Sequence, residues 1–249
     1  MITWRSFGIP TAALLLLAGL AMSQRVALAD VPTTVTLTLT GVNGASLGGV
    51  YTNPYEFQIG TNSSTVWLVC DDFTTETWVD DSWPAQMFSL GDVTGNAKFQ
   101  ATTSVTFPTD YSDLGSYTPQ QEYDAAAALA ELLLPQPPSN TYVGVANAEL
   151  ISFAIWQIFY PKAIDGWGGQ GLTEGQVSSV NTYMQEAFAG DFPLTYPVYI
   201  YTPDPTNESQ EFIGLVSAPE GSTIALTVFD LLAVFAVLVL WRRRMLRRA

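Results

Sequence analysis

The C-terminal end of the chain places the strongest constraint on its architecture. An apolar run of 18 residues, 224–241, is followed at once by a cluster of arginines that includes Arg242, Arg243 and Arg244. As a helix, this run would span roughly 27 Å, close to the roughly 30 Å thickness of a bilayer's hydrocarbon core. Arginines at one end of such a helix stay on the cytoplasmic side. The pattern therefore predicts a transmembrane helix at 224–241, with the preceding residues outside the cytoplasm.

A short signature precedes the apolar run and consists of Pro219, Glu220, Gly221, Ser222 and Thr223. The order of a Pro-Glu-Pro-Ser-Thr-like motif, one hydrophobic segment and terminal arginines resembles the PEP-CTERM sorting signal of exported bacterial proteins. Residues 217–249 carry this resemblance, and the chain departs from the motif at Gly221, where the family has its second proline. The resemblance implies two partners: an exosortase, which is the membrane protease of that sorting system, and the inner membrane.

The N-terminus carries a second targeting pattern. Arg5 precedes an apolar core at 9–22, and Ala27-Leu28-Ala29 supplies the small-x-small pattern of a cleavage site. These features predict a secretory signal peptide at 1–29, after which the mature chain begins near Asp30.

Residues 30–216 form the exported domain, and their length suits one domain with a real core. The stretch between the two targeting segments carries 21 acidic residues and only two basic ones, Lys98 and Lys162, which gives a net charge of −19. Such a charge repels phosphate backbones, so nucleic acid is excluded as a partner. The chain has no histidine, which excludes Ser-His-Asp and Cys-His catalysis and His-based zinc sites.

Hydrophobic periodicity predicts an α+β fold. A period of two, or a short apolar run, indicates strands at 34–40, 50–59, 66–69, 73–79, 85–90, 196–201 and 210–216. Capping-box patterns at Thr118 with Gln121 and at Thr173 with Gln176 predict two helices. A third, mostly buried helix is expected at about 146–160. We therefore expect a single β-rich, sandwich-like domain with a central insertion of about three helices.

A cysteine and a distant helix carry a weaker resemblance. Cys70-Asp71 ends a predicted strand, and Ala154-Ile155-Trp156 lies on the buried helix. This combination resembles the thioester domains of bacterial surface adhesins, in which the cysteine bonds to a glutamine two residues before the alanine. That position here is Ser152, which has no acyl group to supply. The resemblance implies the scaffold without the thioester, and Cys70 is expected to be a buried thiol that serves packing.

Carboxylates and aromatic residues supply the remaining candidate sites. Asp71, Asp72, Asp80, Asp81 and Asp165 are candidate cation ligands, and calcium would be the ion because it accepts several loop oxygens. No Asp-x-Asp-x-Asp-Gly spacing is present, so three interpretations stay open: turn chemistry, calcium binding and an acid-base carboxylate pair.

Aromatic side chains could serve either a ligand or the core. Trp167, in a glycine-rich loop, is the tryptophan best placed to be exposed to a sugar ring. Trp67 and Trp156 fall within apolar elements, which favours core packing.

Together these features predict an exported cell-surface or extracellular-matrix protein with a structural or exopolysaccharide-associated role. No enzymatic activity is expected, and no cofactor apart from the calcium alternative. Two other functions remain: an adhesin that resembles a thioester domain but binds its ligand non-covalently, and a His-free glycosidase.

Overall fold

The computed structural model describes residues 32–61, 64–99, 117–137, 139 and 141–215. The predicted signal peptide, sorting signal and transmembrane helix lie outside these residues. Among the helices described, none has the length and apolar character needed to cross a membrane. The described residues belong to the domain between the two targeting segments.

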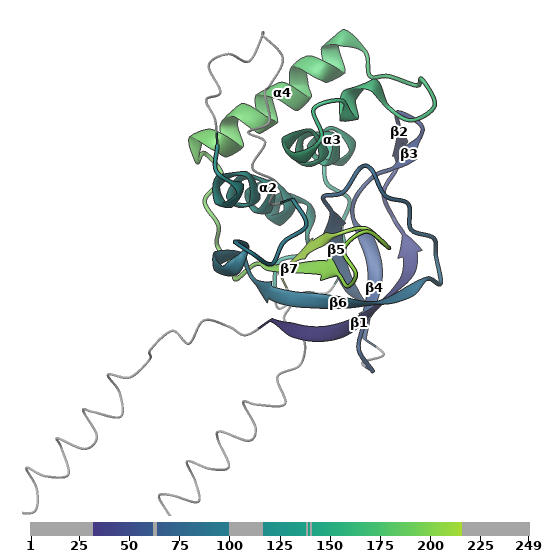
Figure 1. The fold of residues 1–249 in the computed structure, drawn as a ribbon. Helices are drawn as coiled ribbons and strands as arrows, with labels where there is room; N and C mark the ends of the chain where they lie inside the picture. The colour runs from purple at the N-terminus through teal and green to yellow at the C-terminus, as the bar shows by residue number, and fades with distance from the viewer. Residues whose placement is uncertain (1–31, 62–63, 100–116, 138, 140, 216–249) are drawn as a thin grey trace, which may run out of the picture.

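A closed barrel of antiparallel strands forms one half of the domain (Figure 1). Its strands are β1 (Thr33–Val42), β4 (Tyr55–Ile59), β5 (Val66–Cys70), β6 (Ser82–Ser89), β7 (Tyr199–Pro203) and β8 (Phe212–Gly214). Their order is β1-β4-β5-β8-β7-β6, and the barrel closes because β1 pairs with β4 along one side and with β6 along the other. The α+β class is confirmed, but the sandwich-like arrangement was wrong, because one sheet curls onto itself.

The barrel interior is a packed core. Alternate side chains of all six strands point inward, namely Leu37, Leu39, Tyr55, Phe57, Ile59, Val66, Leu68, Cys70, Trp83, Ala85, Tyr201 and Phe212. The rings of Phe57 and Phe212 lie 4.6 Å apart between centroids at its centre. This period of two is the pattern that predicted the strands.

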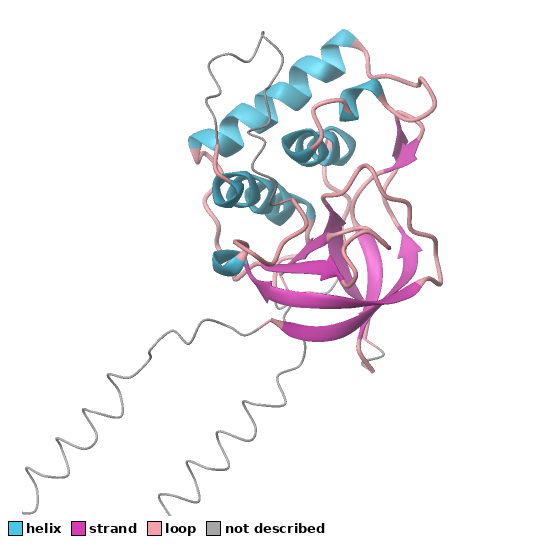
Figure 2. Ribbon diagram, in the orientation of Figure 1, coloured by secondary structure: helices cyan, strands magenta, loops and turns pink. Residues whose placement is uncertain are grey.

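Three helices cover one side of the barrel (Figures 1 and 2). They are α2 (Pro119–Leu133), α3 (Ala148–Phe159) and α4 (Glu174–Ala189), and both predicted capping boxes are present at the starts of α2 and α4. The central helix α3 packs against α2 and α4. A second core joins the helices to the outward-facing side chains of the barrel, such as Val69, Ile200 and Ile213.

A short hairpin and two single turns complete the fold. A hairpin of β2 (Ser46–Leu47) and β3 (Val50–Tyr51) turns through two glycines with positive φ, and single turns η1 (Leu90–Asp92) and η3 (Ala163–Asp165) follow β6 and α3. The predicted strand at 50–59 is divided, because both the amide and the hydroxyl of Thr52 donate back to the carbonyl of Ala45.

The predicted strand at 73–79 was wrong. Backbone amides of this segment bind side-chain carboxylates and not a neighbouring strand. Oδ1 of Asp72 accepts from the amide of Thr74, and Oδ2 of Asp81 accepts from the amide of Trp78. Local bonds of this kind compete with strand pairing. The segment is a loop that leaves the barrel and carries the ring of Phe73 toward the helices.

Candidate functional site

The node around Cys70 joins the barrel to α3. The side chain of Asn53 holds the backbone of Cys70 on both sides, since its Oδ1 accepts from the amide at 2.6 Å and its Nδ2 donates to the carbonyl at 3.1 Å. Trp156 Nε1 donates to the same carbonyl at 2.9 Å. Oγ of Ser152 accepts from the amide of Asn53 at 3.1 Å and donates to the carbonyl of Ala148 at 2.8 Å.

The structure therefore brings the two thioester-like positions into one buried node, with Asn53 between them. Cys70 and Ser152 are both inaccessible to solvent. A glutamine at position 152 would provide an acyl group, whereas the serine hydroxyl is already committed to two backbone partners. The node thus joins the two positions through Asn53 and lacks the electrophile for a thioester.

The Cys70 thiol is held in its protonated form. Burial raises its pKa well above the ordinary value, and the nearby charge of Asp72 raises it further. The thiol donates to the carbonyl of Asp72 at 3.2 Å. Since the thiolate is the reactive species, this environment suppresses reactivity.

Asp72 forms a sealed ion pair. Its Oδ2 lies 2.5 Å from Nζ of Lys98, and the two side chains are 0% and 11% exposed. The ammonium group also donates to Oγ of Thr75 at 2.9 Å and to the carbonyl of Ser209 at 3.0 Å, so each of its three protons has an acceptor. The pair ties the loop after β5 to the segment after η1, and the bond from Lys98 to Ser209 extends the contact to the segment before β8.

Asp71 and Glu211 form a second buried acidic pair. Glu211 accepts hydrogen bonds from the hydroxyls of Tyr123 and Thr202 and from the amide of Lys98. Among the described residues, no side-chain or backbone donor reaches the carboxyl oxygens of Asp71, and the interaction that its side chain makes is with the carboxyl group of Glu211. Burial raises the pKa of Asp71 strongly, and the charges of Glu211 and then Asp72 raise it further. Burial also raises the pKa of Glu211, against its three donors, so we assign the charge to Glu211 and the proton to Asp71.

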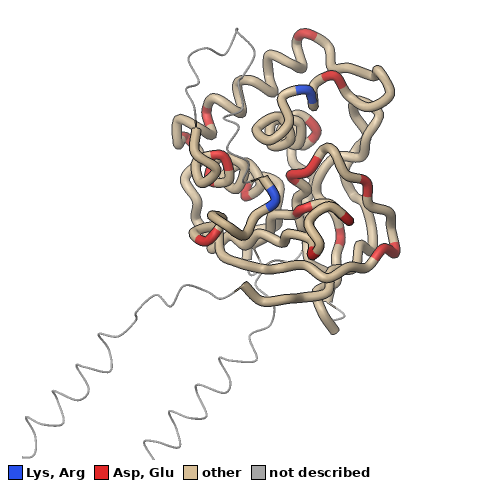
Figure 3. Tube along the Cα trace, viewed as in Figure 1, with Lys and Arg blue, Asp and Glu red and all other residues tan. Residues whose placement is uncertain are grey.

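The remaining predicted cation ligands lie elsewhere. Asp80 occupies an exposed turn with φ of 75°, Asp81 caps the same turn, and Asp165 is exposed in η3. Within the described ranges, no three Asp, Glu, Cys or His side chains form a group that could hold a metal ion. Figure 3 shows acidic residues distributed over both halves of the domain.

Sequence reasoning missed Lys98, Tyr123 and Glu211. The available signal was the isolation of Lys98, one of only two basic residues in the domain. A lysine in so acidic a domain is a natural partner for a buried carboxylate. Nothing in the local sequence of Glu211 or Tyr123 indicates their pairing, which joins residues 88 positions apart.

An aromatic shelf lies beside the Cys70 node. We define it as Phe73, Tyr160 and Trp167, supported from beneath by Phe153 and Trp156. Phe73 is central: its ring stacks on Tyr160 at 5.9 Å between centroids and meets Trp167 edge-to-face at 6.4 Å. It also contacts the rings of Phe153 and Trp156, at 6.0 and 5.3 Å. Tyr160 is 36% exposed and Trp167 is 46% exposed, so two of the three rings reach the surface.

Trp156 and Trp67 differ in their burial. Trp156 is buried, as expected, and links the shelf to the carbonyl of Cys70. Trp67 is only partly buried, and its ring lies 5.3 Å from that of Tyr142.

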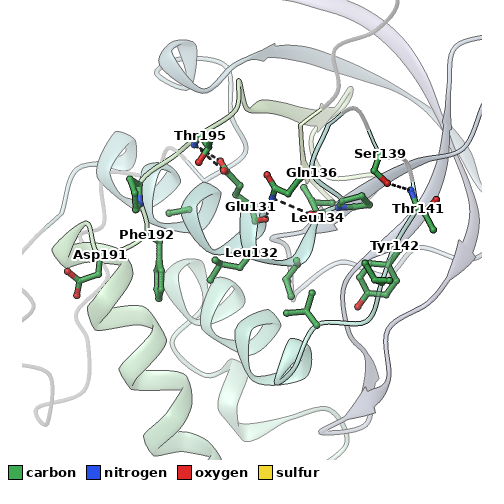
Figure 4. Close-up of a pocket in the computed structure, with 16 residues that line it drawn as sticks. Glu131, Leu132, Leu134, Gln136, Ser139, Thr141, Tyr142, Asp191, Phe192 and Thr195 are labelled. Carbon is green, nitrogen blue, oxygen red and sulfur yellow. Dashed lines mark hydrogen bonds between the residues drawn. The ribbon is translucent and has the colours of Figure 1, made fainter.

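A groove lies on the helical half, away from the node (Figure 4). It has a volume of about 720 Å³ and runs between the C-terminal end of α2, Ser139 and the segments 141–145 and 191–195. Leu132, Val143 and Phe192 make its lining largely apolar. Both carboxylate oxygens of Glu131 accept from the amide of Thr195 at 3.0 Å, which occupies the acid that could otherwise act in the groove.

The comparisons with known proteins give information on the fold alone. No protein-family profile and no curated sequence matches the chain. Among solved structures, the pilus-presented adhesin Spy0125 (Cpa) is similar at 13% identity over 76% of this chain, with a TM-score of 0.47. The N-terminal thioester domain of a surface protein from Clostridium perfringens is similar at 10% identity, over 74% of this chain and 99% of that domain, with a TM-score of 0.42.

The chain spans 64% of the length of the adhesin that it matches. At these identities and TM-scores, the similarity carries no argument about function. The function must therefore be inferred from the residues of this chain.

Proposed function

We propose that residues 30–216 form an exported ligand-binding domain that acts at the cell surface or in the extracellular matrix without forming a covalent bond to its ligand. Ser152 carries this proposal. A covalent mechanism at the node would need an acyl donor for Cys70, and the serine hydroxyl is engaged by Asn53 and Ala148 instead. The thiol is buried, with a raised pKa, so it also lacks the reactivity of a nucleophile.

Catalysis by carboxylates has little support in the described part of the chain. A glycosidase needs two carboxyl groups that reach the substrate, roughly 5 to 10 Å apart. Asp71 and Glu211 are fully buried, and Glu131 in the groove is bound by backbone amides. We therefore propose a binding role for the domain.

The route to the surface is the second part of the proposal. The signature at 219–223, the apolar run at 224–241 and the arginines after it support sorting through a PEP-CTERM and exosortase pathway. The chain would be held in the inner membrane by its C-terminal helix before processing, and the acidic domain would then associate with exopolysaccharide. A thioester-domain-like adhesin that binds its ligand non-covalently is the second candidate, supported by the node in which Asn53 joins Cys70 and Ser152.

Intact-mass measurement of the protein from its native host tests the route. The expected species begins near Asp30 and lacks the residues from Arg242 onward. Released protein that retains 242–249 would contradict exosortase processing and leave a single-span membrane anchor.

Extraction of surface-bound protein tests the binding mode. Protein associated with cells or matrix should be released completely by denaturant and should migrate on a denaturing gel at the mass of the processed chain. Denaturant-resistant adducts would contradict non-covalent binding.

A further inference from the structure

The loop that carries Trp167 is built to fix the position of this residue. The amide of Trp167 donates to the carbonyl of Gly48 at 2.7 Å, and the amide of Gln170 donates to the carbonyl of Trp167 at 3.3 Å. Two glycines have positive φ and no room for a side chain, since a Cβ at Gly49 would lie 2.8 Å from the Trp167 carbonyl and one at Gly166 would lie 2.3 Å from the Gln170 carbonyl. The backbone of Trp167 is therefore clamped between the β2–β3 hairpin and its own loop.

The clamped residue nevertheless leaves almost half of its surface exposed to solvent. A tryptophan recruited only to the core would be buried much as Trp156 is, at 2% exposure. Phe73 supports the indole from one side and stacks on Tyr160 on the other, so the two exposed rings are held at fixed positions about one shared ring. Aromatic groups held rigidly at a surface lose little conformational entropy when a ligand binds.

Polar residues adjoin the shelf in sequence. Lys162, Asp165 and Gln170 lie on the same connection from α3 to α4 that carries Trp167, and Thr74 lies next to Phe73. A ligand for such a surface needs an apolar face to stack on the rings and hydrogen-bonding groups around its edge. A hexose ring has this division, because its axial C–H bonds form the face and its hydroxyls form the rim.

The charge of the domain narrows the class of ligand further. A net charge of −19 repels uronate or sulfate polymers, while an uncharged polymer meets no such barrier. We propose that the aromatic shelf binds a neutral polysaccharide by stacking hexose units on Trp167 and Tyr160. This inference rests on the proposed binding function and names its ligand class.

Titration calorimetry on the full-length chain in detergent tests the proposal. The probes are a soluble neutral glucan, a soluble neutral galactomannan, alginate as a polyuronate, and a de-N-acetylated glucosamine polymer as a polycation. We expect binding to at least one neutral polymer and none to alginate. Trp167→Ala and Tyr160→Ala should each weaken the neutral interaction about tenfold, the effect of losing one stacking contact together with its buried area.

Trp78→Ala is the matched control, because Trp78 is 69% exposed and lies outside the ring contacts of the shelf. It should bind as the unmodified chain does. Equal losses in Trp78→Ala and Trp167→Ala would overturn the assignment to the shelf. Binding to the polycation alone, unchanged in both shelf variants, would also overturn it and would identify simple charge attraction.

Glycine variants test the clamp by a separate route. Gly166→Ala should weaken glycan binding, because the new methyl group collides with the Gln170 carbonyl, whereas Gly168→Ala meets no atom within 4 Å and shares the same positive φ. Failure of every neutral polymer to bind would overturn the ligand class alone. The denaturant extraction from native cells decides the proposed function independently of this result.

Discussion

Asp71 and Glu211 meet at the end of the β5–β8 ladder, where the amide of Asp71 donates a 3.3 Å hydrogen bond to the carbonyl of Glu211. Both side chains are sealed from solvent. Glu211 has three donors, whereas the carboxyl group of Asp71 accepts from no donor in the described part of the chain and faces the carboxyl group of Glu211. We therefore assign one proton to this buried pair, and the free energy of unfolding of the domain should depend on pH.

The pKa values predict that the domain is most stable in mild acid. Asp71 and Glu211 have raised pKa values, and burial raises the pKa of Glu122 from 4.5 to about 7. For a carboxyl group with a raised pKa, the folded state binds more protons than the unfolded state, so the free energy of unfolding falls as pH rises. For Glu122 this loss should occur between pH 4.5 and about 7, and urea unfolding across that range measures it.

Two substitutions assign the pH dependence. Glu122→Gln should flatten the slope below pH 7 without changing the rest of the curve. Asp71→Asn, a neutral isostere of the protonated acid, should leave stability unchanged in acid and raise it at neutral pH. A free energy of unfolding that rises from pH 4.5 to 7 would contradict the assigned protonation states.

The ion pair between Lys98 and Asp72 predicts a large effect of a single substitution. Lys98→Met leaves the fully buried Asp72 without its countercharge, which should lower the free energy of unfolding by about 3 to 5 kcal/mol. Lys162→Met removes the other lysine of the domain, which makes no ion pair among the described residues, and should change stability by less than about 0.5 kcal/mol. Chemical denaturation of both variants at one pH gives the comparison. Equal losses of stability would show that the buried pair does not stabilise the fold.

Asn53 should matter more than its position in a connecting segment suggests. Asn53→Ala leaves the buried amide of Cys70 without an acceptor, at a cost of about 1 to 3 kcal/mol. The carbonyl of Cys70 keeps its bond from Trp156. Asn43→Ala removes an asparagine whose side-chain bond to Glu56 is exposed, so it serves as the control and should be close to neutral in the same unfolding assay. Equal unfolding midpoints for Asn53→Ala and Asn43→Ala would show that Asn53 does not stabilise the node.

The sequence predicted the elements best where the determinants are local. The capping boxes at Thr118 and Thr173 each depend on a residue three positions away, and both helices begin where they were expected. Alternation in β1 identified a strand with Leu37 and Leu39 inward. At 73–79 the apolar pattern was outweighed by Asp72 and Asp81, whose carboxylates bind backbone amides of the loop.

The barrel and the buried acids could not be predicted because they depend on contacts between distant residues. Closure needs Leu37 to pair with Ile59 on one side and with Trp83 on the other. A strand pattern alone does not distinguish this registration from a two-sheet arrangement. Asp71 and Asp72 looked like turn residues or calcium ligands, since the sequence places Glu211 and Lys98 far from them.

The absence of a thioester is the central claim, and intact mass under denaturing conditions tests it most directly. The unmodified chain should have the full mass expected for its residues, and it should form no adduct with a small amine. Ser152→Gln places an acyl group in the node beside Cys70, and ammonia loss in that variant alone would show that the architecture is competent and that the serine accounts for the difference. Loss of one ammonia from the unmodified chain, with rapid labelling by the amine, would contradict the account.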